Sequence, residues 1–171
     1  MTPVGLDLSL TSTGMSWMNE QSVIRTKLFG PERLHLISEM ILSYLNKIDT
    51  PIVIVEGYSF ASRNSQAHSI GELGGVVRVS LWRNQIPYVD VPPTSRAKFA
   101  TGKGNAGKGE VMSAVSARTG IVWSGSGADD MCDAWILEEM GLVKLGRPRF
   151  DWPAINKSAL DKIDWSNLPN E

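Results

Sequence analysis

Four acidic residues stand at places in the sequence where a carboxylate is costly. Asp7 lies inside an apolar segment, Glu56 ends the most apolar segment, and Asp130 and Asp133 begin a strongly helical one. An ionised carboxylate in a buried segment is unfavourable unless a cation compensates it. Asp130 and Asp133 are three residues apart and share a helix face. The four positions together predict one acidic cleft.

This cleft predicts divalent cations. Like charges held close together destabilise a fold unless they are neutralised, and Mg²⁺ or Mn²⁺ prefers carboxylate oxygens. Zinc is not expected, because Cys132 points away from the Asp130 and Asp133 face and the two histidines, His35 and His68, lie in unrelated segments.

Each acid taken singly also has a structural explanation. Asp7 is suited to capping a turn, and Glu56 to a position just outside the sheet beside a glycine. Asp129 and Asp130 are favoured in the first turn of a helix by the helix dipole. Three independent accidents would be needed to explain the whole set, so we favour a functional cluster.

The elements that must position these acids are predicted from hydrophobic periodicity. We expect strands at 4–10, 14–18, 22–28, 51–56 and 86–91, and helices at 31–45, 64–83, 108–118 and 129–143. The first three strands form an antiparallel meander, and the later ones alternate with helices. This order predicts an α/β fold with a mixed five-stranded sheet flanked by helices.

Composition favours one domain at 1–145, with a Pro- and Trp-containing extension at 146–171 that wraps it. The chain has 171 residues and one cysteine, which predicts a reducing compartment. No segment resembles a membrane span or a signal peptide, so we expect a cytoplasmic protein. Residues 62–118 carry 8 basic and 3 acidic residues, a pattern typical of a surface that grips a polyanion.

Four segments resemble the motifs of RuvC-type Holliday junction resolvases, members of the RNase H-like superfamily. They are GLDLSLTSTGMSW at 5–17, VIVE at 53–56, GELGG at 71–75 and DMCDA at 130–134. Their order and spacing match over residues 4–142. A divergent phage-type member, in a bacterium or a phage-infected host, fits this resemblance.

The resemblance implies a homodimer that cuts two opposed strands of a four-way DNA junction symmetrically. It implies two Mg²⁺ or Mn²⁺ ions per active site, which activate a water and stabilise the leaving oxygen. Lys108, and with a displacement of one position Lys98, resemble the family's basic residues near the scissile phosphate. The metal ligands by resemblance are Asp7, Glu56, Asp130 and Asp133.

Further residues are predicted to bind DNA. The resemblance implies an aromatic residue that enters the junction centre, and Phe60 is our choice over Tyr58. The basic stretch supplies phosphate contacts that position DNA without reading its bases. The candidates are Arg63, Arg96, Lys98, Lys103 and Lys108.

Several other functions fit the sequence less well. GKGNAGKG at 102–109 nearly matches a P-loop, but Gly109 replaces the required hydroxyl residue and no apolar strand precedes it, so no nucleotide cofactor is expected. An actin-like kinase would need about twice this length. An RNase H-like nuclease acting on flap DNA or RNA–DNA hybrid, and a non-catalytic junction-binding protein, are the alternatives.

Overall fold

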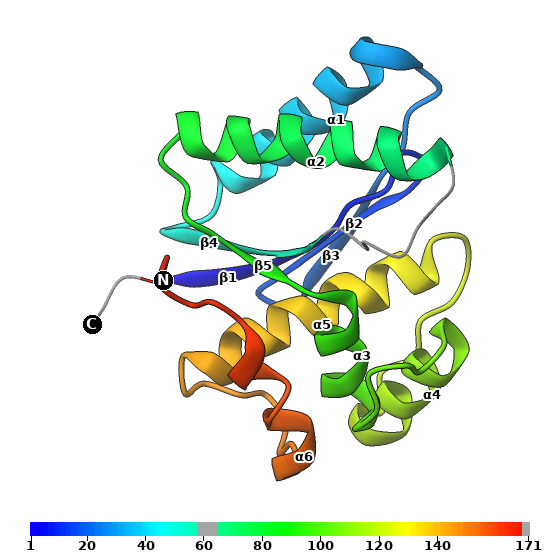
Figure 1. Ribbon diagram of the computed structural model, residues 1–171, viewed down its shortest axis with the longest axis vertical. Helices are drawn as coiled ribbons and strands as arrows, with labels where there is room; N and C mark the ends of the chain where they lie inside the picture. The colour runs from blue at the N-terminus through cyan, green and yellow to red at the C-terminus, as the bar shows by residue number, and fades with distance from the viewer. Residues whose placement is uncertain (58–64, 169–171) are drawn as a thin grey trace.

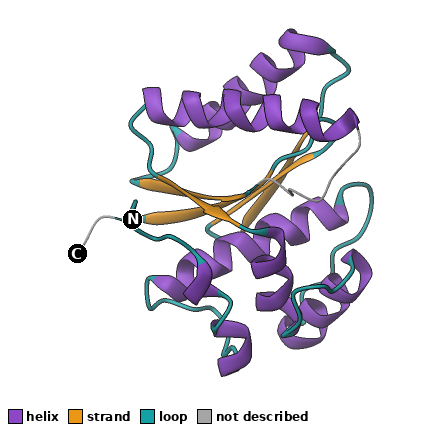
Figure 2. Ribbon diagram, viewed as in Figure 1, coloured by secondary structure: helices purple, strands orange, loops and turns teal. Residues whose placement is uncertain are grey.

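A five-stranded sheet separates two layers of helices in the computed structural model, which describes residues 1–57 and 65–168 (Figures 1 and 2). The strands are β1 (Thr2–Asp7), β2 (Thr13–Trp17), β3 (Glu20–Ile24), β4 (Pro51–Glu56) and β5 (Tyr88–Val91). The helices are α1 (Gly30–Leu45), α2 (Ser65–Arg83), α3 (Pro93–Thr101), α4 (Lys108–Thr119), α5 (Ala128–Lys144), α6 (Ala154–Lys157) and the 3₁₀ turn η1 (Leu160–Lys162).

The sheet order is β3-β2-β1-β4-β5. β1 pairs antiparallel with β2, and β2 pairs antiparallel with β3, which confirms the predicted meander. β4 pairs parallel with both β1 and β5. The predicted mixed sheet flanked by helices is therefore confirmed.

Side chains of the central strands alternate between two hydrophobic cores. On β4, Val53 and Val55 pack with the α1 and α2 side, whereas Ile52 and Ile54 pack with α5. Successive strand residues point to opposite faces, and both faces here carry helices (Figure 1). This two-sided burial explains the continuous run of β-branched residues.

The C-terminal segment completes the core on the α5 side. Trp152 is buried and its ring lies 4.3 Å from that of Phe99 on α3. Asn156 donates a hydrogen bond to the Phe99 carbonyl oxygen at 2.7 Å. Leu160 and Ile163 belong to the same buried cluster. The segment packs against α3 and contributes buried side chains to this core.

Some predicted boundaries were wrong, and two helices were not predicted. β1 ends at Asp7 rather than at residue 10, because Ser9 and Thr13 close a turn: the Thr13 hydroxyl donates to the Ser9 carbonyl oxygen at 2.7 Å. β3 likewise ends at Ile24. The unpredicted helices are α3, whose nine residues show little apolar periodicity, and the four-residue α6. In the described part of the chain, no helix has the length and apolar character needed to cross a membrane.

Candidate active site

Strand alternation and register bring Asp7 and Glu56 together. Leu6 pairs with Val55 in the parallel β1/β4 ladder, so the next residues, Asp7 and Glu56, are neighbours at the ends of the two strands. Leu6 and Val55 face α1 and α2. Because side chains alternate along a strand, Asp7 and Glu56 face the opposite side, where α5 lies.

Two glycines allow α5 to lie close enough to add its acids. A Cβ atom on Gly5 would come within 1.8 Å of the Ala134 carbonyl oxygen, and one on Gly14 within 2.2 Å of the Asp130 carbonyl oxygen. Gly14 pairs directly with Asp7 across the β1/β2 ladder. The α5 backbone therefore rests on the sheet beside Asp7, which places Asp130 and Asp133 at the same corner.

Replacing Gly14 with alanine is expected to push α5 away from the sheet. The added methyl group has no space, so we expect a loss of about 1–3 kcal/mol in the free energy of unfolding, measured by urea denaturation. Gly109→Ala is the matched control, because a Cβ there meets nothing within 4 Å in the described structure. In α4 that change should stabilise by about 0.5 kcal/mol. Equal effects of the two substitutions would contradict the close packing.

The acidic corner is electrostatically strained. Burial raises the pKa of Asp7 well above its usual range, and the neighbouring carboxylates of Glu56 and Asp133 raise it further. Burial also raises the pKa of Asp133 to about 6, although Arg96 opposes this. Asp130 contributes a further negative charge next to Asp7. The four predicted acids thus act on one another, and the corner demands positive charge.

Arg96 supplies part of that charge, in a place that sequence reasoning missed. It lies on α3 and is only 8% exposed. Its Nε donates to the Glu56 Oε2 atom at 2.6 Å, and its Nη1 donates to Asp133 Oδ1. We predicted a DNA-phosphate contact for Arg96, but in this arrangement its guanidinium faces the acids. The excess of basic residues at 62–118 did not indicate whether an individual side chain points outward to DNA or inward to the acids.

The donor chemistry of the corner fits a hard cation. Arg96 bonds two of the four carboxylates, Glu56 and Asp133, and oxygen is the ligand that Mg²⁺ and Mn²⁺ prefer. Among the described residues, however, no three acidic, histidine or cysteine side chains are grouped so that they could hold a metal ion. The guanidinium lies between Glu56 and Asp133 and bonds both. The guanidinium therefore neutralises part of the negative charge that the sequence patterns had led us to assign to metal ions alone.

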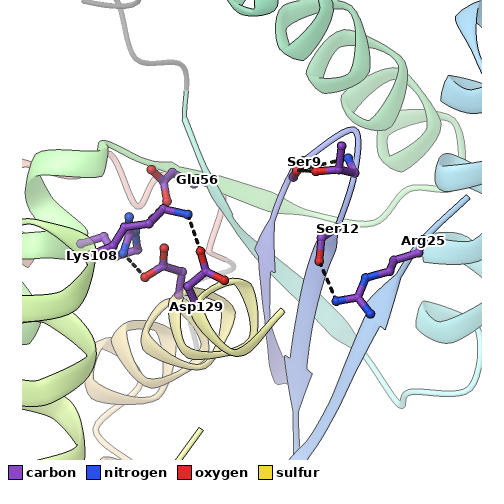
Figure 3. A network of polar contacts seen from close by, with 9 residues as sticks. Ser9, Ser12, Arg25, Glu56, Lys108 and Asp129 are labelled. Carbon is purple, nitrogen blue, oxygen red and sulfur yellow. Dashed lines mark hydrogen bonds and ion pairs between the residues drawn. The ribbon is translucent and has the colours of Figure 1, made fainter. Parts of the chain in front are cut away.

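Lys108 stands at the edge of the corner, as Figure 3 shows. Lys108 is the first residue of α4, and its Nζ lies 2.9 Å from Asp129 Oδ2. Although partial burial opposes it, the hydrogen bond to Asp129 raises the pKa of Lys108, and the charges of Asp133 and Asp7 add to this. Asp129, which we interpreted only as a helix-start residue, therefore holds the predicted lysine beside the acids. The only sequence signal was its position before Asp130.

The other predicted DNA contacts are less closely tied to this corner. Lys98 is half-buried on α3, and Lys103 is exposed in the following turn, 3.4 Å from Glu110. The predicted residues Tyr58, Phe60 and Arg63 lie outside the described residues.

Comparisons with known proteins point in one direction. No family model matches the chain. It is 28% identical over 128 residues to a protein of Carboxydothermus hydrogenoformans named crossover junction endodeoxyribonuclease RuvC, covering 75% of this chain and 80% of that one. A protein of Prochlorococcus marinus with the same name is 29% identical over 114 residues, covering 66% and 73%.

Solved structures agree with the fold. T. thermophilus RuvC in complex with a Holliday junction substrate superimposes with a TM-score of 0.67 and 23% identity, over 86% of this chain and 97% of that one. A second Thermus thermophilus RuvC structure gives 0.64 and 22%, over 86% and 98%. The sheet order and the flanking helices match the RNase H-like fold of these RuvC structures. In sequence, the chain is similar to the two RuvC proteins.

Proposed function

We propose that this protein is a metal-dependent endonuclease that resolves four-way DNA junctions or related branched DNA, and acts in recombination and repair. The observation that carries the proposal is the meeting of Asp7, Glu56, Asp130 and Asp133 at one corner, contributed by β1, β4 and α5. The names of the RuvC relatives supply the reaction and the substrate. The Holliday junction bound in the T. thermophilus RuvC complex supports the same class of DNA.

The carboxylates would hold two Mg²⁺ or Mn²⁺ ions. When bound, such ions lower the pKa of the attacking water and stabilise the departing 3′ oxygen of a phosphodiester. Asp7, at the end of β1 between β2 and β4, would contribute to holding both ions. Glu56 would serve one, and the α5 acids Asp130 and Asp133 the other. The protein's own part is to fix these oxygens on rigid strand ends and a helix that glycines hold against the sheet.

Lys108 would stabilise the negative charge that develops on the phosphate. Replacing Lys108 with methionine is expected to lower the cleavage rate about 100-fold, as for loss of one charge-stabilising donor. Asp129→Asn should lower it about tenfold, because Asp129 positions the lysine.

The double variant separates positioning from any independent role. If Asp129 acts through Lys108, adding Asp129→Asn to Lys108→Met should change the rate no further. The measurement is single-turnover cleavage of a labelled junction. Additive effects of the two substitutions would contradict the positioning role.

We infer that the protein acts as a homodimer, so that two opposed strands are cut. A stripe on α2 supports this: Gly75, Val79 and Trp82 follow helical spacing, and Trp82 is 75% exposed. An exposed stripe with a glycine at one end and large apolar side chains along it suits close contact with a second copy.

Trp82→Asp is expected to weaken this dimer roughly 30-fold, as for loss of an interface hot spot. Sedimentation equilibrium at micromolar concentration checks it. Phe29→Asp is the control, because Phe29 is 77% exposed but lies before α1. A native chain that sediments as a monomer with and without DNA would overturn the dimer.

The substrate is tested by cleavage of three matched DNAs with Mg²⁺: a four-way junction, a flap and an RNA–DNA hybrid. The proposal expects paired nicks on the junction and little cutting of the others. Cutting confined to flap or hybrid would keep the chemistry and replace the substrate. Tight junction binding without cleavage would instead indicate a non-catalytic junction-binding protein.

A further inference from the structure

We infer that Arg96 is a built-in counter-ion of the acidic corner, which divalent cations must displace from Glu56 and Asp133. This inference rests on the proposed function, because it assumes that the carboxylates bind such cations. It adds a competitor within the chain itself, which lowers the apparent affinity for metal.

The contacts of Arg96 occupy the ligand atoms. Its Nε donates a hydrogen bond to Glu56 Oε2 at 2.6 Å, and its Nη1 donates one to Asp133 Oδ1. Glu56 comes from a strand end and Asp133 from α5, so the guanidinium joins the two elements across the corner. A metal ion that used these oxygens would need the same space.

Arg96 cannot leave the corner by losing its proton. An arginine guanidinium stays charged in proteins, and here Glu56 and Asp133 outweigh the effect of burial and raise its pKa further. A divalent ion between the same acids would be repelled by it at short range. Metal binding therefore requires the side chain to move.

The helix that carries Arg96, α3, is anchored by contacts with the C-terminal segment. The Phe99 ring packs on Trp152, and Asn156 bonds the Phe99 carbonyl oxygen. Because these contacts anchor the α3 backbone, the expected movement is a swing of the long Arg96 side chain, with α3 remaining in place.

A second arginine, Arg149, forms ion pairs that have more support than those of Arg96. Arg149 also bridges two acids of α5, Glu138 and Glu139. Glu139 additionally accepts a hydrogen bond from Trp152 Nε1 at 3.0 Å, and Glu138 accepts one from Ser16 at 2.6 Å.

The Arg96 pair has no such additional support. Among the described residues, hydrogen bonds to the Glu56 and Asp133 carboxylates come from Arg96 alone. The acids at Arg149 thus have hydrogen-bond donors besides the arginine, whereas the two acids at Arg96 depend on the guanidinium.

The test compares Arg96→Met with the native chain in the absence of DNA. Binding of Mn²⁺ alone is measured by calorimetric titration. The variant should bind Mn²⁺ at least about tenfold more tightly than the native chain, which is within the usual range of coupling between two bound species. Without metal the variant should unfold at a lower temperature, because its acids lose their counter-ion. Mg²⁺ should then raise its unfolding temperature more than that of the native chain.

Arg149→Met is the matched control: it should lose stability with no change in Mn²⁺ affinity. If Arg96→Met does not fold without metal, Arg96→Lys is used in its place. Lysine keeps the positive charge but cannot bond two carboxylates with a planar guanidinium, so an intermediate gain in Mn²⁺ affinity is expected. Unchanged or weaker Mn²⁺ binding in both Arg96 variants overturns the inference. If the native chain binds Mn²⁺ and these variants do not gain affinity, only the inference fails; if neither native chain nor variant binds Mn²⁺, the proposed function fails as well.

Discussion

Asp7→Asn is expected to abolish junction cleavage and, at the same time, to make the metal-free protein harder to unfold. The Asp7 carboxylate interacts with all three other acids of the corner, so its loss should reduce the single-turnover rate roughly a thousandfold or more. Its burial beside Glu56 and Asp133 raises its pKa well above the usual range, which means that its charged form opposes folding. The neutral amide keeps the shape and removes that charge.

The two effects must appear together to support the proposed role. Thermal unfolding in EDTA and cleavage of a labelled junction in Mg²⁺ measure them on the same preparation. Asp90→Asn is the control, since Asp90 is an exposed acid of β5 that pairs with Arg78. It should lower the stability slightly and leave the chemical step intact. Cleavage by Asp7→Asn at the native rate would remove Asp7 from the active site and overturn the proposed function.

Trp152→Ala is expected to destabilise the whole domain, although the residue lies in the C-terminal segment. Trp152 is 1% exposed, packs on Phe99, and donates from Nε1 to the buried Glu139. Removing a buried tryptophan leaves a cavity and costs about 3–5 kcal/mol. For a chain of this size that lowers the unfolding temperature by roughly 10 °C.

The same substitution should loosen α3 and with it Arg96. Hydrogen exchange of residues 93–101 is expected to rise in Trp152→Ala, because Phe99 loses its packing partner. Ile155→Ala lies in the same segment but removes a side chain that is 57% exposed, so it should stay within about 0.5 kcal/mol of the native stability. If both substitutions had equally small effects, the C-terminal segment would not be part of the core.

The strands and the helix that carry the four acids could be predicted, because the patterns that indicate them are local in the sequence. The β-branched run before Glu56 indicates a strand buried on both faces, and the apolar residues before Asp7 indicate another. Spacing places Asp130 and Asp133 on one helix face. These patterns depend on neighbours in the sequence, and the structure confirms the elements that they predict.

The sequence by itself determined which residues we propose for the chemistry: four acids on two strands and one helix, together with Lys108. Only the tertiary structure decided what surrounds them. Arg96 turns inward to Glu56 and Asp133, and Asp129 holds Lys108. The physical reason is that an ion pair between residues 37 or 40 positions apart leaves no periodic trace in a single sequence. The direction of a charged side chain is set by the helices packed around it, and those contacts exist only in the folded chain.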